Sequence, residues 1–172
     1  MRVVGLDPSL TSFGCARPEG VGLLRPPKGL GGAGRMIWLR DSVLELCRDA
    51  DLVVVEGMSY GSGGRSIFDL GGLGWVLRVA LTERGIPWVE ASPSSLKKYA
   101  TGKGNAGKEL VLVEAVKRLG YTGSSYDEAD ALWLRMMALD YYGQPGAVQV
   151  PQAHRAGLSG VSWPAIDRKA VV

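Results

Sequence analysis

Two apolar segments that each end on a carboxylate limit most strongly the folds open to this sequence. Residues 2–7 read Arg-Val-Val-Gly-Leu-Asp, and residues 52–56 read Leu-Val-Val-Val-Glu. Continuous apolar runs of this length are typical of strands that are covered on both faces, as in parallel sheets. We therefore expect two buried strands with Asp7 and Glu56 at their carboxyl ends, the edge where open sheets place ligand sites.

The rest of the chain alternates strand and helix patterns, which predicts an α/β fold, a mixed five-stranded sheet with helices on both faces. A chain of 172 residues has the size of one domain. We expect a domain over 1–142 and an irregular tail over 143–172 that contains the single histidine, His154. Ser92-Pro93 is a cap followed by a proline at the first helical position. Further strands are expected at 12–17, 21–25 and 87–91, and helices at 35–48, 66–84, 108–119 and 127–142, with a short helix from Pro93 that ends before a basic loop at 101–107.

A second pair of acids opens the last predicted helix. Asp127 and Asp130 are three residues apart and therefore neighbours on one helix face, whereas Glu128 is rotated away by about 100°. The positive end of the helix dipole favours anions there. One alternative is that Asp127 and Asp130 only cap the helix. The other is that they join Asp7 and Glu56 in one site.

Four converging carboxylates would repel one another without cations. Oxygen ligands with no partnering Cys or His indicate magnesium or manganese, not zinc. Two such ions about 4 Å apart would clamp a scissile phosphate, one activating water and the other stabilising the leaving 3′ oxygen. We therefore expect a nuclease site with two Mg²⁺ ions, for which Mn²⁺ can substitute.

The distribution of positive charge favours a polyanionic partner. The stretch from Lys97 to Lys108 has four lysines, at 97, 98, 103 and 108, and no acid. The first 40 residues have six basic side chains, one of them Arg35, against only Asp7 and Glu19. Such stretches suit DNA, although a solvated basic face is the alternative interpretation.

Six motifs in order resemble the RuvC family of Holliday junction resolvases and its phage relatives. The resemblance covers residues 1 to about 140 and implies a ribonuclease-H-like fold, a homodimer, and magnesium-dependent paired nicking of four-way DNA. The matching stretches are Gly5-Leu6-Asp7-Pro8-Ser9, Val54-Val55-Glu56, Leu70-Gly71, Ser95-Leu96-Lys97, the loop from Gly102 to Lys108, and Asp127-Glu128-Ala129-Asp130-Ala131-Leu132. The two cysteines, Cys15 and Cys47, form no disulfide framework and indicate a reducing cytoplasm, which is that of the bacterial host if the protein is encoded by a phage.

This resemblance also implies roles for individual residues. The family's four metal-binding acids correspond to Asp7, Glu56, Asp127 and Asp130, which the residue patterns select independently. Lys97 and Lys108 correspond to lysines near the scissile phosphate, where an ammonium group can steady the charge of the transition state. Members of the family have an aromatic residue just after the second acid that stacks on bases of the junction. Here the third residue after Glu56 is Ser59, and Tyr60 follows it. Tyr60 is therefore either the stacking aromatic or an ordinary loop tyrosine. The remaining DNA-binding candidates are Arg65, Lys98 and Lys103.

The helix expected at 66–84 is apolar nearly all round. One face can pack on the sheet, and Ile67, Phe68, Trp75 and Val79 leave the other apolar as well. We expect this second face to form the interface of a two-fold dimer. The alternative is that the C-terminal tail covers it.

Three other functions compete with this interpretation. A sugar-kinase or actin-like ATPase shares the strand-Gly-x-Asp start, but it needs a second domain that 172 residues do not supply. A non-catalytic DNA-binding module is opposed by the four acids, which weaken DNA binding unless metals are present. A ribonuclease H that cleaves RNA–DNA hybrids is the nearest alternative.

Overall fold

The computed structural model describes residues 1–58 and 65–166, except for the side chains of residues 65 and 66. Its centre is a five-stranded sheet in the order β3-β2-β1-β4-β5. The strands β1, β4 and β5 are parallel, whereas β2 pairs antiparallel with both β1 and β3. The predicted mixed sheet is therefore confirmed. The bounds are β1 (Val3–Asp7), β2 (Phe13–Arg17), β3 (Gly20–Leu24), β4 (Leu52–Glu56) and β5 (Trp88–Ala91).

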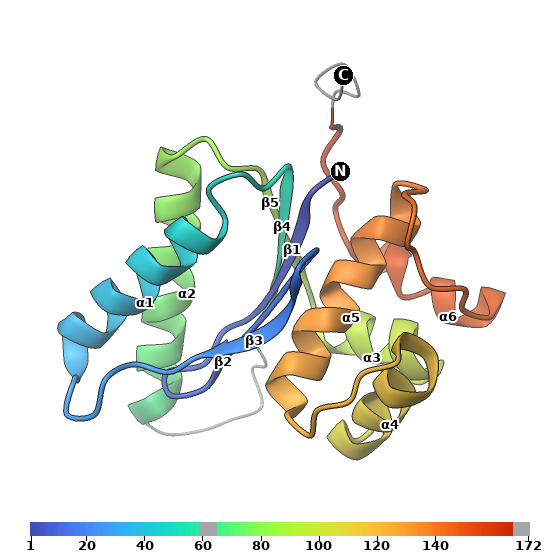
Figure 1. Cartoon of the computed structure of the whole chain (residues 1–172), viewed down its shortest axis with the longest axis horizontal. Helices are drawn as coiled ribbons and strands as arrows, with labels where there is room; N and C mark the ends of the chain where they lie inside the picture. Colours follow the sequence, from blue (N-terminus) through green and yellow to red (C-terminus); the bar gives the residue numbers. More distant parts are fainter. Residues whose placement is uncertain (59–64, 167–172) are drawn as a thin grey trace.

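Helices cover both faces of the sheet (Figure 1). α1 (Gly32–Leu46) and α2 (Arg65–Glu83) lie on one face, and α3 (Pro93–Thr101), α4 (Lys108–Leu119) and α5 (Tyr126–Tyr141) lie on the other. The hydroxyl of Ser92 accepts a hydrogen bond from the backbone N–H of Ser95 at 3.1 Å, as predicted for the cap of α3. Within the described ranges, no helix is long and apolar enough to cross a membrane.

The alternation of side chains along β1 and β4 decides which way the two strand-ending acids face. Val4 and Leu6 pack into the core beneath α1 and α2, together with Val53 and Val55. The residues between them point to the opposite face, because successive side chains of a strand alternate. By this parity Asp7 and Glu56 face α5.

Glycines in β1 and β2 let α5 approach the sheet closely. A Cβ added at Gly5 would lie 2.0 Å from the carbonyl oxygen of Ala131, and one added at Gly14 would lie 2.0 Å from that of Asp127. No side chain fits in either space. The first turns of α5, which carry Asp127 and Asp130, therefore lie directly on the strands.

Residues 143–166 contain only a four-residue helix, α6 (Gln152–Arg155), and a 3₁₀ turn, η1 (Leu158–Gly160). This C-terminal segment packs against α3. Gly157 lies so close that a Cβ there would be 2.5 Å from the carbonyl oxygen of Ser95. The alternative in which the tail covers α2 is therefore wrong for the described part of the tail. The boundary at residue 142 stays a prediction.

Replacing Gly5 with Ala should destabilise the protein, because the new methyl group would collide with the backbone of α5. Overpacking of this kind costs about 1–3 kcal/mol, which we expect as a loss in the free energy of unfolding measured by urea denaturation. Gly22→Ala in β3 is the matched control, since its Cβ would meet only the sulfur of Cys15 at 3.8 Å. Equal stability of the two variants would contradict the close approach of α5.

Candidate active site

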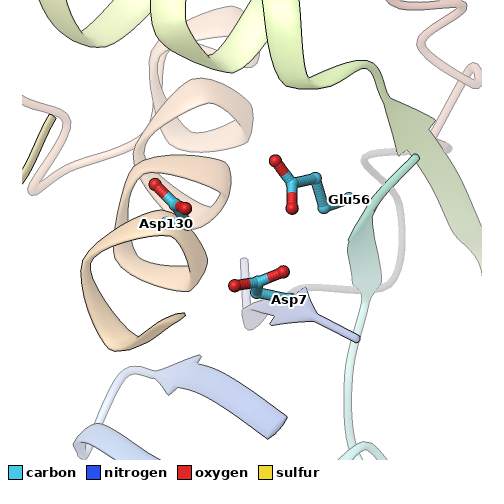
Figure 2. A group of neighbouring side chains, drawn as sticks. All are labelled: Asp7, Glu56 and Asp130. Atoms are coloured by element: carbon cyan, nitrogen blue, oxygen red, sulfur yellow. The ribbon is translucent and has the colours of Figure 1, made fainter. Parts of the chain in front are cut away.

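Three carboxylates from three elements meet at the carboxyl edge of the central strands. Leu6 of β1 pairs with Val55 of β4, so Asp7 and Glu56 are neighbours at the next position. Asp130 reaches the same place from α5 (Figure 2). Oxygen atoms of these three carboxylates lie within 4.8 Å of one another. Parallel pairing of the strands and the close approach of α5 together produce this cluster.

Asp127 lies one turn earlier on α5 and lines the same cavity, outside the 4.8 Å cluster. It does not cap the helix, because the cap is Ser125, whose hydroxyl accepts a hydrogen bond from the N–H of Glu128 at 3.3 Å. The interpretation of Asp127 and Asp130 as a capping pair is therefore wrong. The carboxylate of Glu128 accepts a hydrogen bond from the hydroxyl of Tyr121 and belongs to that pair instead.

Burial and mutual repulsion raise the pKa values of the three clustered acids, so these carboxyl groups retain protons at a higher pH than usual. Burial raises the pKa of Asp7 well above its usual value, and the charge of Glu56 and a hydrogen bond to it raise it further. Burial and the charge of Glu56 raise the pKa of Asp130 to about 7, although Lys108 opposes the shift. Burial also raises the pKa of Glu56, whereas the hydrogen bond from Asp7, Lys108 and Lys97 lower it.

The cluster fits a hard divalent cation. Its donors are all carboxylate oxygens, which magnesium and manganese prefer. A cation among them would replace the protons that the raised pKa values retain, and the carboxylates would then ionise without repelling one another. Asp7, Glu56 and Asp130 are the residues in position to hold it, with Asp127 beside them.

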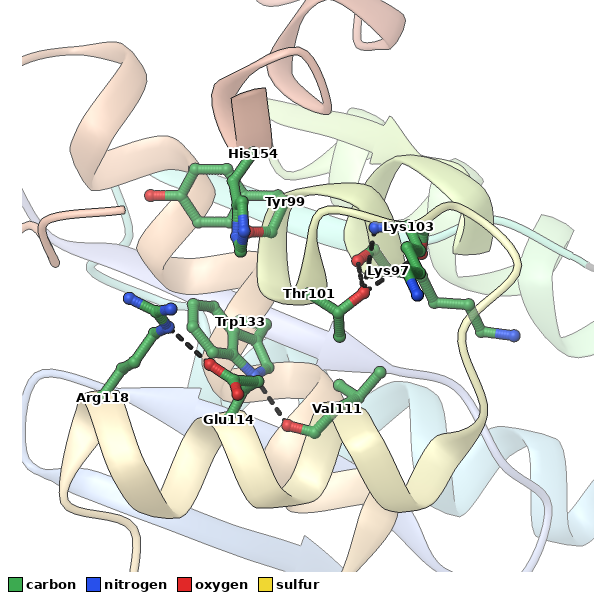
Figure 3. Close-up of polar contacts among 9 residues, drawn as sticks. All are labelled: Lys97, Tyr99, Thr101, Lys103, Val111, Glu114, Arg118, Trp133 and His154. Atoms are coloured by element: carbon green, nitrogen blue, oxygen red, sulfur yellow. Dashed lines mark hydrogen bonds and ion pairs between the residues drawn. The ribbon is translucent and has the colours of Figure 1, made fainter. Parts of the chain in front are cut away.

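The acids lie in a cavity of about 770 Å³ with basic side chains in its wall. Lys97 of α3 and Lys108 of α4 both line it. Lys98 is directed elsewhere, because its ammonium group donates a hydrogen bond to the carbonyl of Gly102 at 2.8 Å. Lys103 is exposed on the loop between α3 and α4, where its N–H donates to the hydroxyl of Thr101 at 3.1 Å (Figure 3).

Several residues to which the sequence assigned no role in the site also line this cavity. Ser9 and Thr11 lie between β1 and β2, whereas Arg35, Asp69 and Arg78 reach the cavity through the packing of α1 and α2 on the sheet, which no local pattern reveals. Tyr60 lies outside the described residues, and so does the side chain of Arg65. His154 is not in the cavity wall; its Nδ1 lies 3.1 Å from the carbonyl oxygen of Tyr99 (Figure 3).

Comparison with known proteins places these features in one family. The family model described as crossover junction endodeoxyribonuclease RuvC matches residues 33–137. The RuvC of Protochlamydia amoebophila is 32% identical over 145 residues, which are 77% of this chain and 86% of that protein. The RuvC of Corynebacterium efficiens is 30% identical over 148 residues, 78% of this chain. The chain spans only 66% of the length of that relative.

Solved structures agree with the fold. The structure of Thermus thermophilus RuvC covers 87% of this chain and 99% of its own, with a TM-score of 0.66 and 23% identity. The same protein in complex with a Holliday junction substrate gives a TM-score of 0.67. The ribonuclease-H-like arrangement expected from the sequence is therefore confirmed. By the match over 33–137 and by its identity to these relatives, the chain belongs to the RuvC family of crossover junction endodeoxyribonucleases.

Proposed function

We propose that this protein resolves Holliday junctions by metal-dependent hydrolysis of one phosphodiester bond in each of two symmetric strands. The observation that carries the proposal is the carboxylate cluster of Asp7, Glu56 and Asp130 in a cavity that Lys97 and Lys108 also line. Membership of the RuvC family supports it, and the Thermus thermophilus relative has been solved with a Holliday junction substrate. A DNA substrate also agrees with the cytoplasmic location that the sequence predicts.

The side chains divide the work between holding metal and holding DNA. Asp7, Glu56, Asp127 and Asp130 would hold two Mg²⁺ ions, which supply Lewis-acid activation of water and stabilisation of the leaving oxygen. Lys97 and Lys108 would neutralise phosphate charge beside the acids. The remaining proposed DNA contacts are Lys98, Lys103, Tyr60 and Arg65. To bind a phosphate, Lys98 would have to break its hydrogen bond to the carbonyl of Gly102.

Cleavage assays on a four-way junction, a linear duplex and an RNA–DNA hybrid, run side by side with magnesium, test the substrate class. We expect paired nicks in the junction and little cleavage of the other two. Preferred cleavage of the hybrid would favour the ribonuclease H alternative. Binding to the junction without cleavage of any substrate would favour a non-catalytic DNA-binding module.

Asp7→Asn should abolish cleavage and leave junction binding largely intact. The substitution removes a metal ligand, yet it also removes a negative charge that repels phosphate. Mutating a residue that only hydrogen-bonds to a metal ligand lowers activity or metal affinity by about 10–100-fold. Removing the ligand itself should therefore lower the cleavage rate by more than about 100-fold. Asp41→Asn is the control, because Asp41 is an exposed residue paired with Arg40. Strong wild-type cleavage in excess chelator would contradict the metal site.

Magnesium should raise the melting temperature of the wild type, and the increase should grow between about pH 4 and pH 7. The raised pKa of Asp130, about 7, means that the folded metal-free protein retains a proton that the unfolded chain releases near pH 4. Stability without metal therefore falls as pH rises through this window, by an amount on the order of a few kcal/mol. Because magnesium binds only the folded, ionised cluster, it should reverse this loss.

Calorimetry with and without magnesium at several pH values measures this effect. Asp130→Asn should reduce both the loss of stability with pH and the gain from magnesium. A magnesium effect that is independent of pH in the wild type would show that the ion binds elsewhere.

The active unit that this proposal requires is a two-fold homodimer, and the outer face of α2 is the proposed interface. Leu73, Leu77 and Leu81 of α2 are buried against the sheet. On the opposite side Phe68 is 79% exposed and Trp75 is 68% exposed. An apolar face of this kind on one helix is typical of a surface that another subunit covers. A two-fold dimer would present one active site to each of two opposing strands.

Val79→Asp should weaken this dimer, because Val79 is half exposed on the same face. We expect a monomer by mass in solution, and a shift from linear to singly nicked product with a cruciform plasmid. Val113→Asp on α4 is the control, since Val113 is also partly exposed, on the other side of the sheet. A wild type that stays monomeric on junction DNA and still linearises the plasmid would exclude the dimer.

A further inference from the structure

We propose that Arg35 binds a backbone phosphate of the DNA strand, on the side of the acid cluster opposite to Lys97 and Lys108. This inference rests on the proposed function, since it adds a second phosphate contact to the same site. Three observations carry it: the residues that line the cavity, the hydrogen bond of Arg35, and the contacts that already hold Arg78, the other arginine in the cavity wall.

The cavity crosses the edge of the sheet and has walls from both helix layers. Lys97 and Lys108 belong to α3 and α4, whereas Arg35 belongs to α1 on the other face (Figure 1). Asp7 and Glu56 end the two central strands between these layers. A strand of DNA that crosses the acids therefore passes from one layer to the other. The lysines can hold its phosphates on one side only. Among the described side chains, Arg35 and Arg78 are the basic residues that line the cavity on the other side.

One hydrogen bond fixes the orientation of the Arg35 guanidinium and leaves its other N–H donors available. Its Nε donates a hydrogen bond to the carbonyl of Leu30 at 2.9 Å, which leaves the two terminal nitrogens for a ligand. Among the described residues, no carboxylate lies within 4.0 Å of it. By contrast, Arg40 and Arg48 on and just after the same helix form ion pairs with nearby acids. A partly buried arginine that is fixed at Nε and unpaired at its terminal nitrogens suits bidentate binding of phosphate.

The second arginine in the cavity wall is already engaged. Arg78 forms an ion pair with Glu90 and lies over the rings of Trp75 and Trp88, at 5.5 and 6.0 Å from their centroids. Moving it to a phosphate would break these contacts. Asp69 of α2 also lines the cavity and would repel a phosphate beside it. A cation is therefore needed on this side if DNA is to follow the cavity.

The salt dependence of junction binding tests this contact. In an Asp7→Asn background with magnesium, Arg35→Ala should reduce the slope of log K against log salt by about one unit, because one phosphate contact is lost, and Lys97→Ala should have the same effect. Arg35→Lys should restore most of the slope, and Arg40→Ala on the same helix should leave it unchanged. Melting temperatures of the variants show that each is folded. If Arg35→Ala and Arg40→Ala have the same slope, the proposal is wrong.

Single methylphosphonate substitutions along the cleaved strand locate the contact. In the parent protein, removing the charge of the phosphate that Arg35 binds should weaken binding, and Arg35→Ala should abolish that sensitivity at one position. The corresponding position for Lys97→Ala should lie on the opposite side of the scissile phosphate. Both positions on the same side would overturn the proposed path of the strand.

The same measurements separate this inference from the proposed function. If the wild type cleaves no junction yet Arg35→Ala still lowers the salt slope on duplex DNA, the proposed function fails and the phosphate contact stands. If the wild type resolves junctions and Arg35→Ala changes neither slope nor methylphosphonate sensitivity, the proposed function stands and this contact is excluded.

Discussion

The close approach of α5 to β1 and β2 is the contact on which the site depends. Gly5 and Gly14 allow backbone to lie on backbone there, and this places the first turns of α5 at the carboxyl edge of the sheet. Asp130 is thereby held beside Asp7 and Glu56 against their repulsion. The cost of this repulsion is offset by the apolar cores on both faces of the sheet, because the acids occupy only its edge.

The charges around the acids explain why the cluster can be both buried and able to meet DNA. Lys97 and Lys108 lower the pKa of Glu56 and Asp130, although burial outweighs them at both. The lysines alone therefore do not suffice to keep all of the carboxylates ionised, and a divalent cation would supply the remaining positive charge. The same lysines line the cavity, so a phosphate placed beside the carboxylates would also lie beside cations.

Much of the fold could be predicted because its signals are local. The apolar runs that end at Asp7 and Glu56 predicted two strands and placed both acids at the carboxyl edge of the sheet. Ser92-Pro93 predicted the start of α3. α1 begins at Gly32, three residues before the predicted start, because Gly31 provides no side-chain cap for the sequence to reveal. Arg35 could not be selected from the basic N-terminal residues, since its place in the cavity depends on how α1 packs across the sheet.

Contacts of the C-terminal segment help to position two helices of the site, although this segment follows the residues that the family model matches. Asp140 of α5 accepts a hydrogen bond from the hydroxyl of Tyr99 at 3.0 Å and pairs with Arg155 of α6 at 3.2 Å. His154 lies at 3.1 Å from the carbonyl of Tyr99, so α6 contacts α3 and α5 together. Lys97 is on α3 and Asp130 is on α5. The spacing between a phosphate-binding lysine and a metal-binding acid is therefore set in part by residues beyond 137, where sequence similarity to the family model ends.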